Sequence, residues 1–248
     1  MIALRSVTKR FGDRVALDDV SMEFRSHATH VVLGSSGSGK STVLRLILGL
    51  LTPDAGEIAV DGVTVGPTTR AALLRAMGYV VQEGGLYPHL TIYQNAALAA
   101  EPHRWPPARV RARVALLAEM VGFDEAILRR YPAQLSVGQR QRASLIRALM
   151  LDPPVLLLDE PLGALDPIVR ADLQTQLGRL FQELGKTVVL VTHDIREAMI
   201  LGETVTLMTA GRVVQRGTFD DLLRHPADAF VREFLKAQTL PAMAEERA

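Results

Sequence analysis

The sequence predicts an α/β fold with a parallel sheet, an antiparallel β region at its N-terminal end and an inserted α-helical subdomain. First, apolar and polar residues alternate on both sides of a turn at residues 11–13, as in an antiparallel strand pair. Second, the aliphatic runs at 155–158 and 187–191 flank a stretch with helical spacing, which indicates a parallel strand-helix-strand crossover. Third, from about 83 to 152 such runs disappear, and apolar residues recur with helical period between prolines.

The elements of the first third of the chain follow from the same patterns. A short apolar strand at 30–33 leads directly into a glycine-rich loop. Apolar residues at helical spacing follow over 43–48, and a Pro-Asp-Ala-Gly break precedes a strand at 57–60. A further short strand at 79–81 ends at Gln82. We therefore expect strand, loop and helix in direct succession around the loop.

The last third returns to strand signals after the helical insertion. Residues 205–208 and 212–214 flank Ala210-Gly211 as an expected hairpin, and an amphipathic helix is expected around 230–235. We expect one domain over residues 1–248, with a core formed by 1–82 and 153–248 and a helical subdomain at about 83–152.

Composition limits the classes of partner. The 28 basic and 27 acidic side chains leave a formal net charge of +1, so no overall field favours nucleic acid, and we expect no nucleic-acid partner. The chain has no cysteine, which excludes disulfides and cysteine-ligated metals. Every apolar run is shorter than the roughly 18 to 20 residues that a membrane helix requires. The charged N-terminus also lacks the apolar centre of a secretion signal. A membrane would have to be reached through a partner.

The loop after the strand at 30–33 reads GSSGSGKST and matches the phosphate-binding pattern G-x-x-x-x-G-K-[ST] in full. Glycine lets the backbone N–H groups approach phosphate oxygens, and the following helix adds its positive end. We expect Lys40 to reach the β and γ phosphates and the hydroxyl of Ser41 to ligate Mg²⁺. A plain Ser/Gly surface loop is the alternative, which the preceding strand and following helix disfavour. The expected cradle consists of Gly34, Ser35, Ser36, Gly37, Ser38, Gly39, Lys40, Ser41 and Thr42. The fold class is therefore that of a P-loop ATPase core.

Two adjacent carboxylates end the buried run at 155–158. We expect Asp159 to belong to the magnesium shell and Glu160 to orient or deprotonate the attacking water. Solvated acids at a strand end are the alternative, which is less favoured beside a P-loop.

With LSVGQRQR at 135–142 upstream of that strand, the chain resembles the nucleotide-binding subunits of ABC transporters over almost all of its length. The resemblance implies that Phe11 stacks on the adenine of ATP and that Gln82 contacts both magnesium and the attacking water. It also implies that His193 hydrogen-bonds the γ phosphate, and that residues 163–166 form the loop that ends in Asp166.

The same resemblance implies a head-to-tail homodimer that holds two nucleotides between its subunits. In that arrangement Ser136, Gly138, Gln139 and Asp166 act on the ATP held by the other subunit's Lys40. The sequence alone leaves an arrangement within one chain open. Val137 departs from the family's usual L-S-G-G-Q, and a β-branched residue resists positive φ, so we expect an effect on turnover rather than on identity.

The stretches at 161–170, 192–198 and 225–231 are most similar to ATPases that import quaternary amines and osmoprotectants such as glycine betaine, choline and carnitine. This similarity implies a transmembrane permease as partner, a periplasmic or lipid-anchored solute-binding protein acting indirectly, and a peripheral place on the cytoplasmic face of the membrane. Residues 83–91 are expected near the groove for the permease. Because the sequence stops at Ala248, we expect no C-terminal regulatory domain.

Three alternatives remain: the ATPase of another importer, that of an export system, and a soluble ABC switch without a permease. A DNA-repair or chromosome ATPase is disfavoured because no sustained heptads occur between Lys40 and Ser136.

Overall fold

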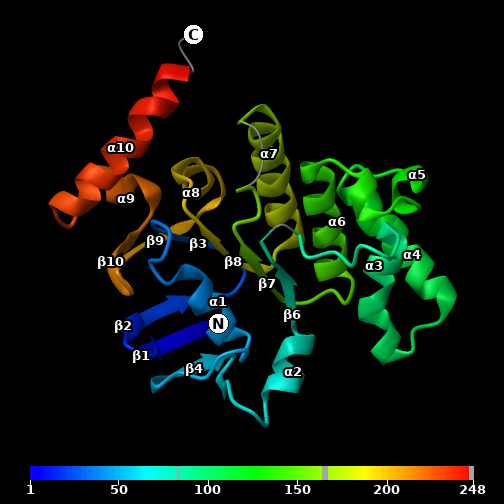
Figure 1. Ribbon diagram of the computed structural model, residues 1–248, viewed down its shortest axis with the longest axis horizontal. Coiled ribbons are helices and arrows are strands. Elements are labelled where there is room, and N and C mark those ends of the chain that lie inside the picture. The colour runs from blue at the N-terminus through cyan, green and yellow to red at the C-terminus, as the bar shows by residue number, and fades with distance from the viewer. Residues whose placement is uncertain (83, 164–166, 246–248) are drawn as a thin grey trace.

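The computed structural model of the protein describes the backbone of residues 1–82, 84–163 and 167–245 (Figure 1). Within these residues the strands form two sheets. In Figure 1 one group of helices lies on the right of the view, another over the top and left, α1 lies at the centre and α2 at the bottom. The predicted α/β fold, with an N-terminal antiparallel sheet, a parallel sheet and an inserted helical part, is confirmed.

The antiparallel sheet has the strand order β2-β1-β4-β5. Its strands are β1 (Ile2–Phe11), β2 (Arg14–Phe24), β4 (Ala55–Val60) and β5 (Val63–Thr64). A two-residue turn joins β1 to β2, and its Gly12 has a φ of +57°, a value that glycine adopts without strain.

The other sheet has the order β10-β9-β3-β8-β7-β6. Its strands are β3 (Thr29–Leu33), β6 (Met77–Val80), β7 (Val155–Asp159), β8 (Thr187–Thr192), β9 (Thr204–Thr209) and β10 (Arg212–Gly217). Neighbouring strands are parallel except in the hairpin of β9 and β10. Because β3, β7 and β8 are parallel neighbours, the loops that follow them leave from the same edge of the sheet.

Side chains of the parallel strands alternate between two apolar clusters. In β7, Val155 and Leu157 belong to a cluster shared with α1 (Lys40–Ile47) and the antiparallel sheet. Leu156 and Leu158 point the other way, into a cluster shared with the helical part of the chain. The continuous apolar run at this strand is therefore explained by burial on both faces.

The remaining helices connect and cover the sheets. Between β5 and β7 lie α2 (Arg70–Arg75), α3 (Ile92–Ala97), η1 (Leu98–His103), α4 (Pro107–Met120), α5 (Glu125–Leu128), η2 (Pro132–Gln134) and α6 (Val137–Leu149). After β7 come α7 (Pro167–Leu184), α8 (Ile195–Leu201), α9 (Phe219–Arg224) and α10 (Ala229–Glu245). None of the helices that the structure describes is long and apolar enough to cross a membrane. The domain limits given above stay a prediction.

The double burial of β7 can be tested by truncating one side chain. Leu158 is 0% exposed, so Leu158→Ala removes apolar contacts and leaves a cavity; we expect a loss of about 2 to 5 kcal/mol in the free energy of unfolding. Leu116 on α4 is 49% exposed, and we expect Leu116→Ala to change that free energy by less than about 0.5 kcal/mol. Urea unfolding of both variants measures the difference, and equal losses would contradict the packing described.

Candidate active site

The loop predicted to bind phosphate runs from the end of β3 to the start of α1 and lies tightly against other backbone. Gly39 precedes α1 with a φ of +102°, and a Cβ there would lie 2.5 Å from the Ala16 carbonyl oxygen. A Cβ on Gly34 would lie 2.3 Å from the Met208 carbonyl oxygen. The two glycines therefore allow the loop to fold into the junction of the two sheets.

Lys40 lies at the first position of α1 with only 4% of its surface exposed. Its ammonium group donates hydrogen bonds to the carbonyl oxygens of Gly34 at 2.8 Å and Ser35 at 3.0 Å. Burial lowers the pKa of Lys40, and the negative charges of Glu160 and Asp159 oppose that shift. The ammonium group is thus held inside the loop by exchangeable neutral acceptors, a state suited to receiving phosphate oxygens.

Asp159 ends β7 and is 3% exposed. The Ser41 hydroxyl donates to its Oδ1 at 2.8 Å, and the Tyr79 hydroxyl donates to its Oδ2 at 3.3 Å. Burial, and then the charge of Asp159, raise the pKa of Tyr79 to about 12, so the phenol stays protonated as a donor. Ser41 and Asp159 form an adjacent pair of oxygen donors, the ligand type that Mg²⁺ prefers.

Glu160 lies close to Gln82 and His193, the two other residues expected to be catalytic, and to Lys40. Its Oε2 lies 3.5 Å from Gln82 Nε2 and 3.3 Å from His193 Nδ1, and its Oε1 lies 3.9 Å from Lys40 Nζ. The backbone at Glu160 has a φ of +44°, uncommon for a residue with a side chain, and its N–H donates to the Val191 carbonyl at 2.9 Å. The ends of β6, β7 and β8 thus converge on one carboxylate.

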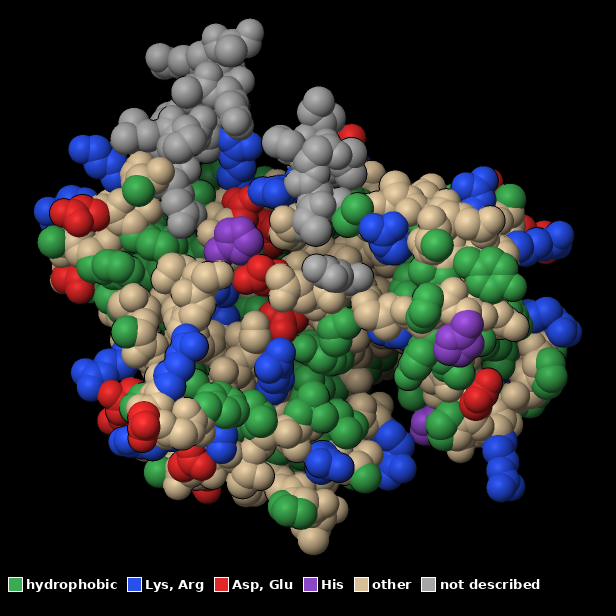
Figure 2. Space-filling model, viewed as in Figure 1, with side chains coloured by type: hydrophobic (Ala, Val, Ile, Leu, Met, Phe, Trp, Pro, Cys, Tyr) green, Lys and Arg blue, Asp and Glu red, His purple; other side chains and the backbone are tan. Residues whose placement is uncertain are grey.

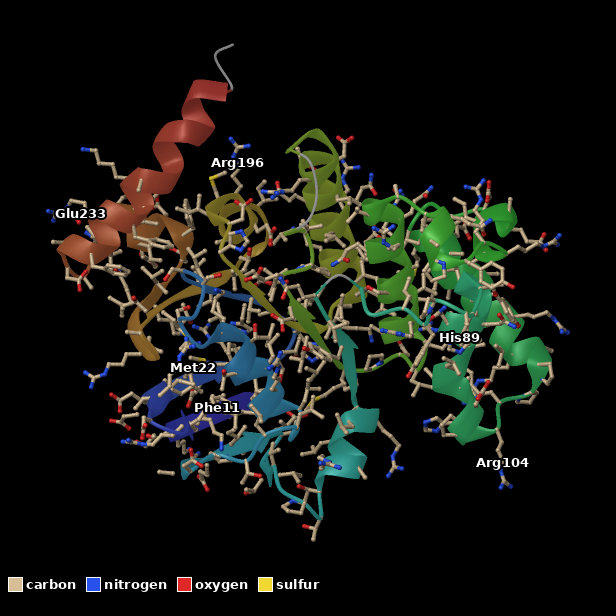
Figure 3. All side chains as sticks on the ribbon, in the orientation of Figure 1. Phe11, Met22, His89, Arg104, Arg196 and Glu233 are labelled. Carbon is tan, nitrogen blue, oxygen red and sulfur yellow. The ribbon has the colours of Figure 1, made fainter. Side chains whose placement is uncertain are left out.

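A pocket of about 410 Å³ opens beside this cluster. It is lined by Phe11, Arg14, Ala16, Ser36, Gly37, Gly39, Lys40, Ser41, Thr42, Gln82 and Glu160. Phe11 is 48% exposed. It lies on the antiparallel sheet (Figure 3). Figure 2 shows acidic, basic and histidine side chains gathered near the centre of this face. The pocket therefore joins an apolar ring to a charged phosphate loop.

The sequence interpretation did not include Arg14 or Tyr79 among the site residues. Arg14 begins β2, lines the pocket, and its guanidinium donates to the Gly37 carbonyl at 3.5 Å. A signal was present, because Arg14 follows directly after the predicted turn at 11–13. Tyr79 carried no signal beyond its place in a strand, because its contact with Asp159 depends on the pairing of β6 with β7.

The signature residues form a separate structure at the start of α6. Ser136 is the N-cap: its Oγ accepts from Gln139 N at 3.2 Å, while Gln139 Oε1 accepts from Ser136 N at 3.0 Å. Gly138 is buried in the first turn. None of the three is among the described residues that line the 410 Å³ pocket. Asp166, which was expected to act with them, lies outside the described residues.

Val137 occupies the first helical position of α6 and packs, half-buried, against the apolar cluster of the helical part. The backbone at Val137 is helical and not at positive φ, so this position does not demand glycine in the chain. The expected conflict with positive φ is not found here, while the effect of Val137 on turnover stays a prediction.

The sheet order, and the loop and carboxylates at the carboxyl edge of the parallel strands, define a P-loop ATPase. The model of the family described as ABC transporter matches residues 17–163, and the chain belongs to this family. It is an ABC-type ATPase coupled to transport.

Curated relatives cover nearly the whole chain. The glycine betaine uptake system ATP-binding protein YehX of Escherichia coli is 44% identical over 94% of this chain and 76% of its own length. The choline transport ATP-binding protein OpuBA of Bacillus subtilis is 41% identical over 97% of this chain and 63% of its own length. The sulfate/thiosulfate import ATP-binding protein CysA of Gloeobacter violaceus is 45% identical over 98% of this chain and 70% of its own length. This chain therefore spans less than two thirds of the choline transport protein.

Solved structures share the fold. A dimeric ATP-binding cassette in a post-hydrolysis state with ADP and Pi superposes with a TM-score of 0.80 at 33% identity, covering 88% of this chain and 99% of that one. CbiO1 of Clostridium perfringens, part of the transporter complex cbiONQ, superposes with a TM-score of 0.82 at 26% identity. The match covers 99% of this chain and 98% of that one.

The tight fit of the loop predicts the effect of one methyl group. In Gly39→Ala the added Cβ meets the Ala16 carbonyl at 2.5 Å with the backbone at a φ of +102°. Such strain costs about 1 to 3 kcal/mol, so we expect nucleotide affinity to fall roughly 10- to 100-fold. Titration with a fluorescent ATP analogue measures the affinity. In Gly66→Ala the added atom meets open space, and its affinity should equal that of the wild type. Unchanged binding by Gly39→Ala would show that the loop does not hold the phosphates.

Proposed function

We propose that this chain hydrolyses ATP to drive import of a quaternary amine or related osmoprotectant through a membrane permease. The observation that carries the solute class is the similarity over nearly the whole chain to ATPases named for glycine betaine and for choline. The amino-acid sequences at residues 161–170 and 192–198, which are also most similar to those of osmoprotectant importers, support the same solute class. Sulfate or thiosulfate is the second candidate solute, because the sulfate/thiosulfate ATPases are 43 to 46% identical to this chain.

We assign the nucleotide to the 410 Å³ pocket, with adenine against Phe11 and the phosphates in the loop from Gly34 to Thr42. The structure supports this because the loop excludes any Cβ at Gly39 and because the buried Ser38 hydroxyl has no hydrogen-bond partner among the described residues. Ser41, Asp159 and Gln82 are the oxygen donors that would hold Mg²⁺. The ion, when bound, neutralises negative charge that develops on the phosphates.

Glu160 is the proposed general base. It accepts a proton from a water molecule whose oxygen attacks the γ phosphorus, so that the bond to the bridging oxygen breaks and ADP leaves with that electron pair. Lys40 compensates negative charge on the phosphates, Gln82 orients the water, and His193 donates a hydrogen bond to the γ phosphate. The support is the single cluster in which Lys40, Gln82 and His193 all lie within 4 Å of the Glu160 carboxylate, at 3.9, 3.5 and 3.3 Å.

The active form is a proposed homodimer with two ATP molecules between its subunits. Ser136, Gly138 and Gln139 lie at the start of α6, where N–H groups and the helix dipole favour an anion. Because they do not line the pocket of their own chain among the described residues, we assign them, with Asp166, to the ATP of the other subunit. The dimeric cassette with ADP and Pi supports this arrangement.

The role of Glu160 predicts a trapped state. Glu160→Gln keeps the shape of the side chain but cannot take the proton, so we expect hydrolysis to fall by about 10² to 10⁴ while ATP binding remains. ATP should then accumulate a dimer, visible by size-exclusion chromatography. Glu101→Gln, an exposed acid on η1, is the matched control with normal turnover. Turnover near that of the wild type in Glu160→Gln would remove Glu160 from this role.

The proposed permease contact lies on the helical part. A groove of about 580 Å³ is lined by Thr91, Tyr93, Gln94, Arg111, Val114, Ala115, Glu125, Leu128 and Arg129. Thr91, which ends the segment expected to lie near the permease, caps α3, and Tyr87 in the same segment is 50% exposed. Glu83 lies outside the described residues. We place the chain peripherally on the cytoplasmic face of the membrane, with a solute-binding protein acting through the permease.

Reconstitution distinguishes the candidate solutes. We would co-express the tagged chain with the products of neighbouring genes, reconstitute any membrane protein that co-purifies, and measure ATPase activity with its binding protein. We expect glycine betaine, choline or carnitine to stimulate hydrolysis, and sulfate not to. Stimulation by sulfate alone would replace the solute class, and export from loaded vesicles would reverse the direction. The absence of any membrane partner would favour a soluble switch ATPase.

A further inference from the structure

A buried acid that the mechanism does not use lies behind the active site. Glu197 is on α8, on the inner face of the helix, and is 1% exposed. Its Oε2 has no hydrogen-bond partner among the described residues. A buried carboxyl group with an unsatisfied oxygen costs stability, and such groups point to a function.

Thr192, which hydrogen-bonds Glu197, is the point where several parts of the active site are joined. The side chain of Thr192 bonds the Glu197 carboxyl group, and its Oγ1 also accepts from Asp194 N at 3.0 Å. The Thr192 carbonyl accepts from Gly34 N at 3.3 Å, at the first residue of the phosphate loop. Thr192 directly precedes His193, so whatever fixes Thr192 also fixes the base of the His193 side chain.

The other side of the same turn is held by α7. Asp194 caps α8, with its Oδ1 accepting from Arg196 N at 2.7 Å, and its Oδ2 accepts from Arg170 Nη1 at 2.9 Å. Arg170 lies in the first turn of α7, and α7 packs against α8 (Figure 1). The turn at 192–194 is therefore fixed by Glu197 through Thr192 and by Arg170 through Asp194.

We propose that Glu197 is a positioning residue for hydrolysis: its buried carboxyl group holds the turn at Thr192 and so sets His193 against Glu160. This inference rests on the proposed function and deepens it. His193 Nδ1 lies 3.3 Å from Glu160 Oε2 while about half of its side chain is exposed, so its orientation depends on the backbone that carries it. Glu197 touches neither nucleotide nor water, and it acts through Thr192.

The charge state of Glu197 follows from its surroundings. Burial raises the pKa of Glu197 to about 8; the negative charges of Asp194 and Glu160 also raise it, while the Thr192 hydrogen bond and Arg170 lower it. The carboxyl group is therefore neutral at pH 7 in the folded chain. Ionisation would place a negative charge beside Asp194 and compete with it for Arg170, which loosens the turn.

Two substitutions separate positioning from packing. Glu197→Gln keeps length and neutrality, so we expect kcat at pH 7 within about twofold of the wild type. Glu197→Asp withdraws the carboxyl group by one methylene, so we expect kcat to fall roughly tenfold with KM for ATP unchanged, because a small displacement of a catalytic group costs rate. Glu233→Gln, an exposed acid on α10 labelled in Figure 3, is the matched control.

The pH profile supplies the readout that a merely structural role would not move. As the pH rises through about 8, kcat of the wild type should fall relative to Glu197→Gln, whereas the ratio of wild type to Glu233→Gln should stay constant. Superposed profiles for wild type and Glu197→Gln overturn the proposal. So does an Asp variant that is as active as the wild type, or one whose kcat and KM change together with its melting temperature.

Thermal unfolding distinguishes failure of this inference from failure of the proposed function. Because the folded pKa lies above the unfolded one, the stability that neutral Glu197 contributes is complete below about pH 4.5 and is lost as the pH rises to about 8. The melting temperature of Glu197→Gln relative to the wild type should therefore rise over that window and level off above it. A wild-type chain that shows this behaviour but hydrolyses no ATP overturns the proposed function and this inference with it; an active chain whose Asp variant is equally active overturns the inference alone.

Discussion

The burial of Lys40 beside Asp159 and Glu160 is the constraint on which the rest of the site depends. An ammonium group with 4% exposure is costly to keep charged, and its stabilisation comes from two loop carbonyls and two nearby carboxylates rather than from water. The loop must therefore wrap closely, which demands glycine at 34 and 39, and the carboxylates must end the neighbouring strand. In the proposed complex the triphosphate of ATP would add negative charge beside Lys40, where the loop carbonyls supply only dipoles.

The parallel sheet transmits this constraint through β8. The carbonyls of Val191 and Thr192 accept from Glu160 N at 2.9 Å and from Gly34 N at 3.3 Å, so the strand that carries His193 also holds the phosphate loop and the proposed base. The two apolar clusters on either face keep these strands in register. A displacement of Thr192 would therefore move Gly34, Glu160 and His193, which are far apart in the sequence.

The sequence predicted most of the fold because its patterns are local. The loop pattern, the runs that became β7 and β8, and the helical spacing of the insertion are all readable within short windows. The clustering of Gln82, Glu160 and His193 was expected only from resemblance, since it depends on which strands are neighbours. Tyr79 and Glu197 could not be predicted for the same reason. The contact of Tyr79 with Asp159 depends on the pairing of β6 with β7. Glu197 is a polar residue of a short helix, and its burial depends on how that helix packs against α7 and β8. Arg14 could have been found, because it follows a predicted turn beside Phe11.

The capping box at α6 bears on whether one residue can serve both the fold and the proposed partner site. The Ser136 hydroxyl accepts a hydrogen bond from Gln139 N, a contact that stabilises the helix by about 1 kcal/mol. A hydroxyl also has one proton to donate, and accepting from the backbone leaves that proton available to a phosphate oxygen. Capping and phosphate binding are therefore compatible, and the cap orients the hydroxyl before a nucleotide arrives. Val137, the next residue, packs on the apolar cluster, so in this chain the capping box forms with valine in place of a second glycine.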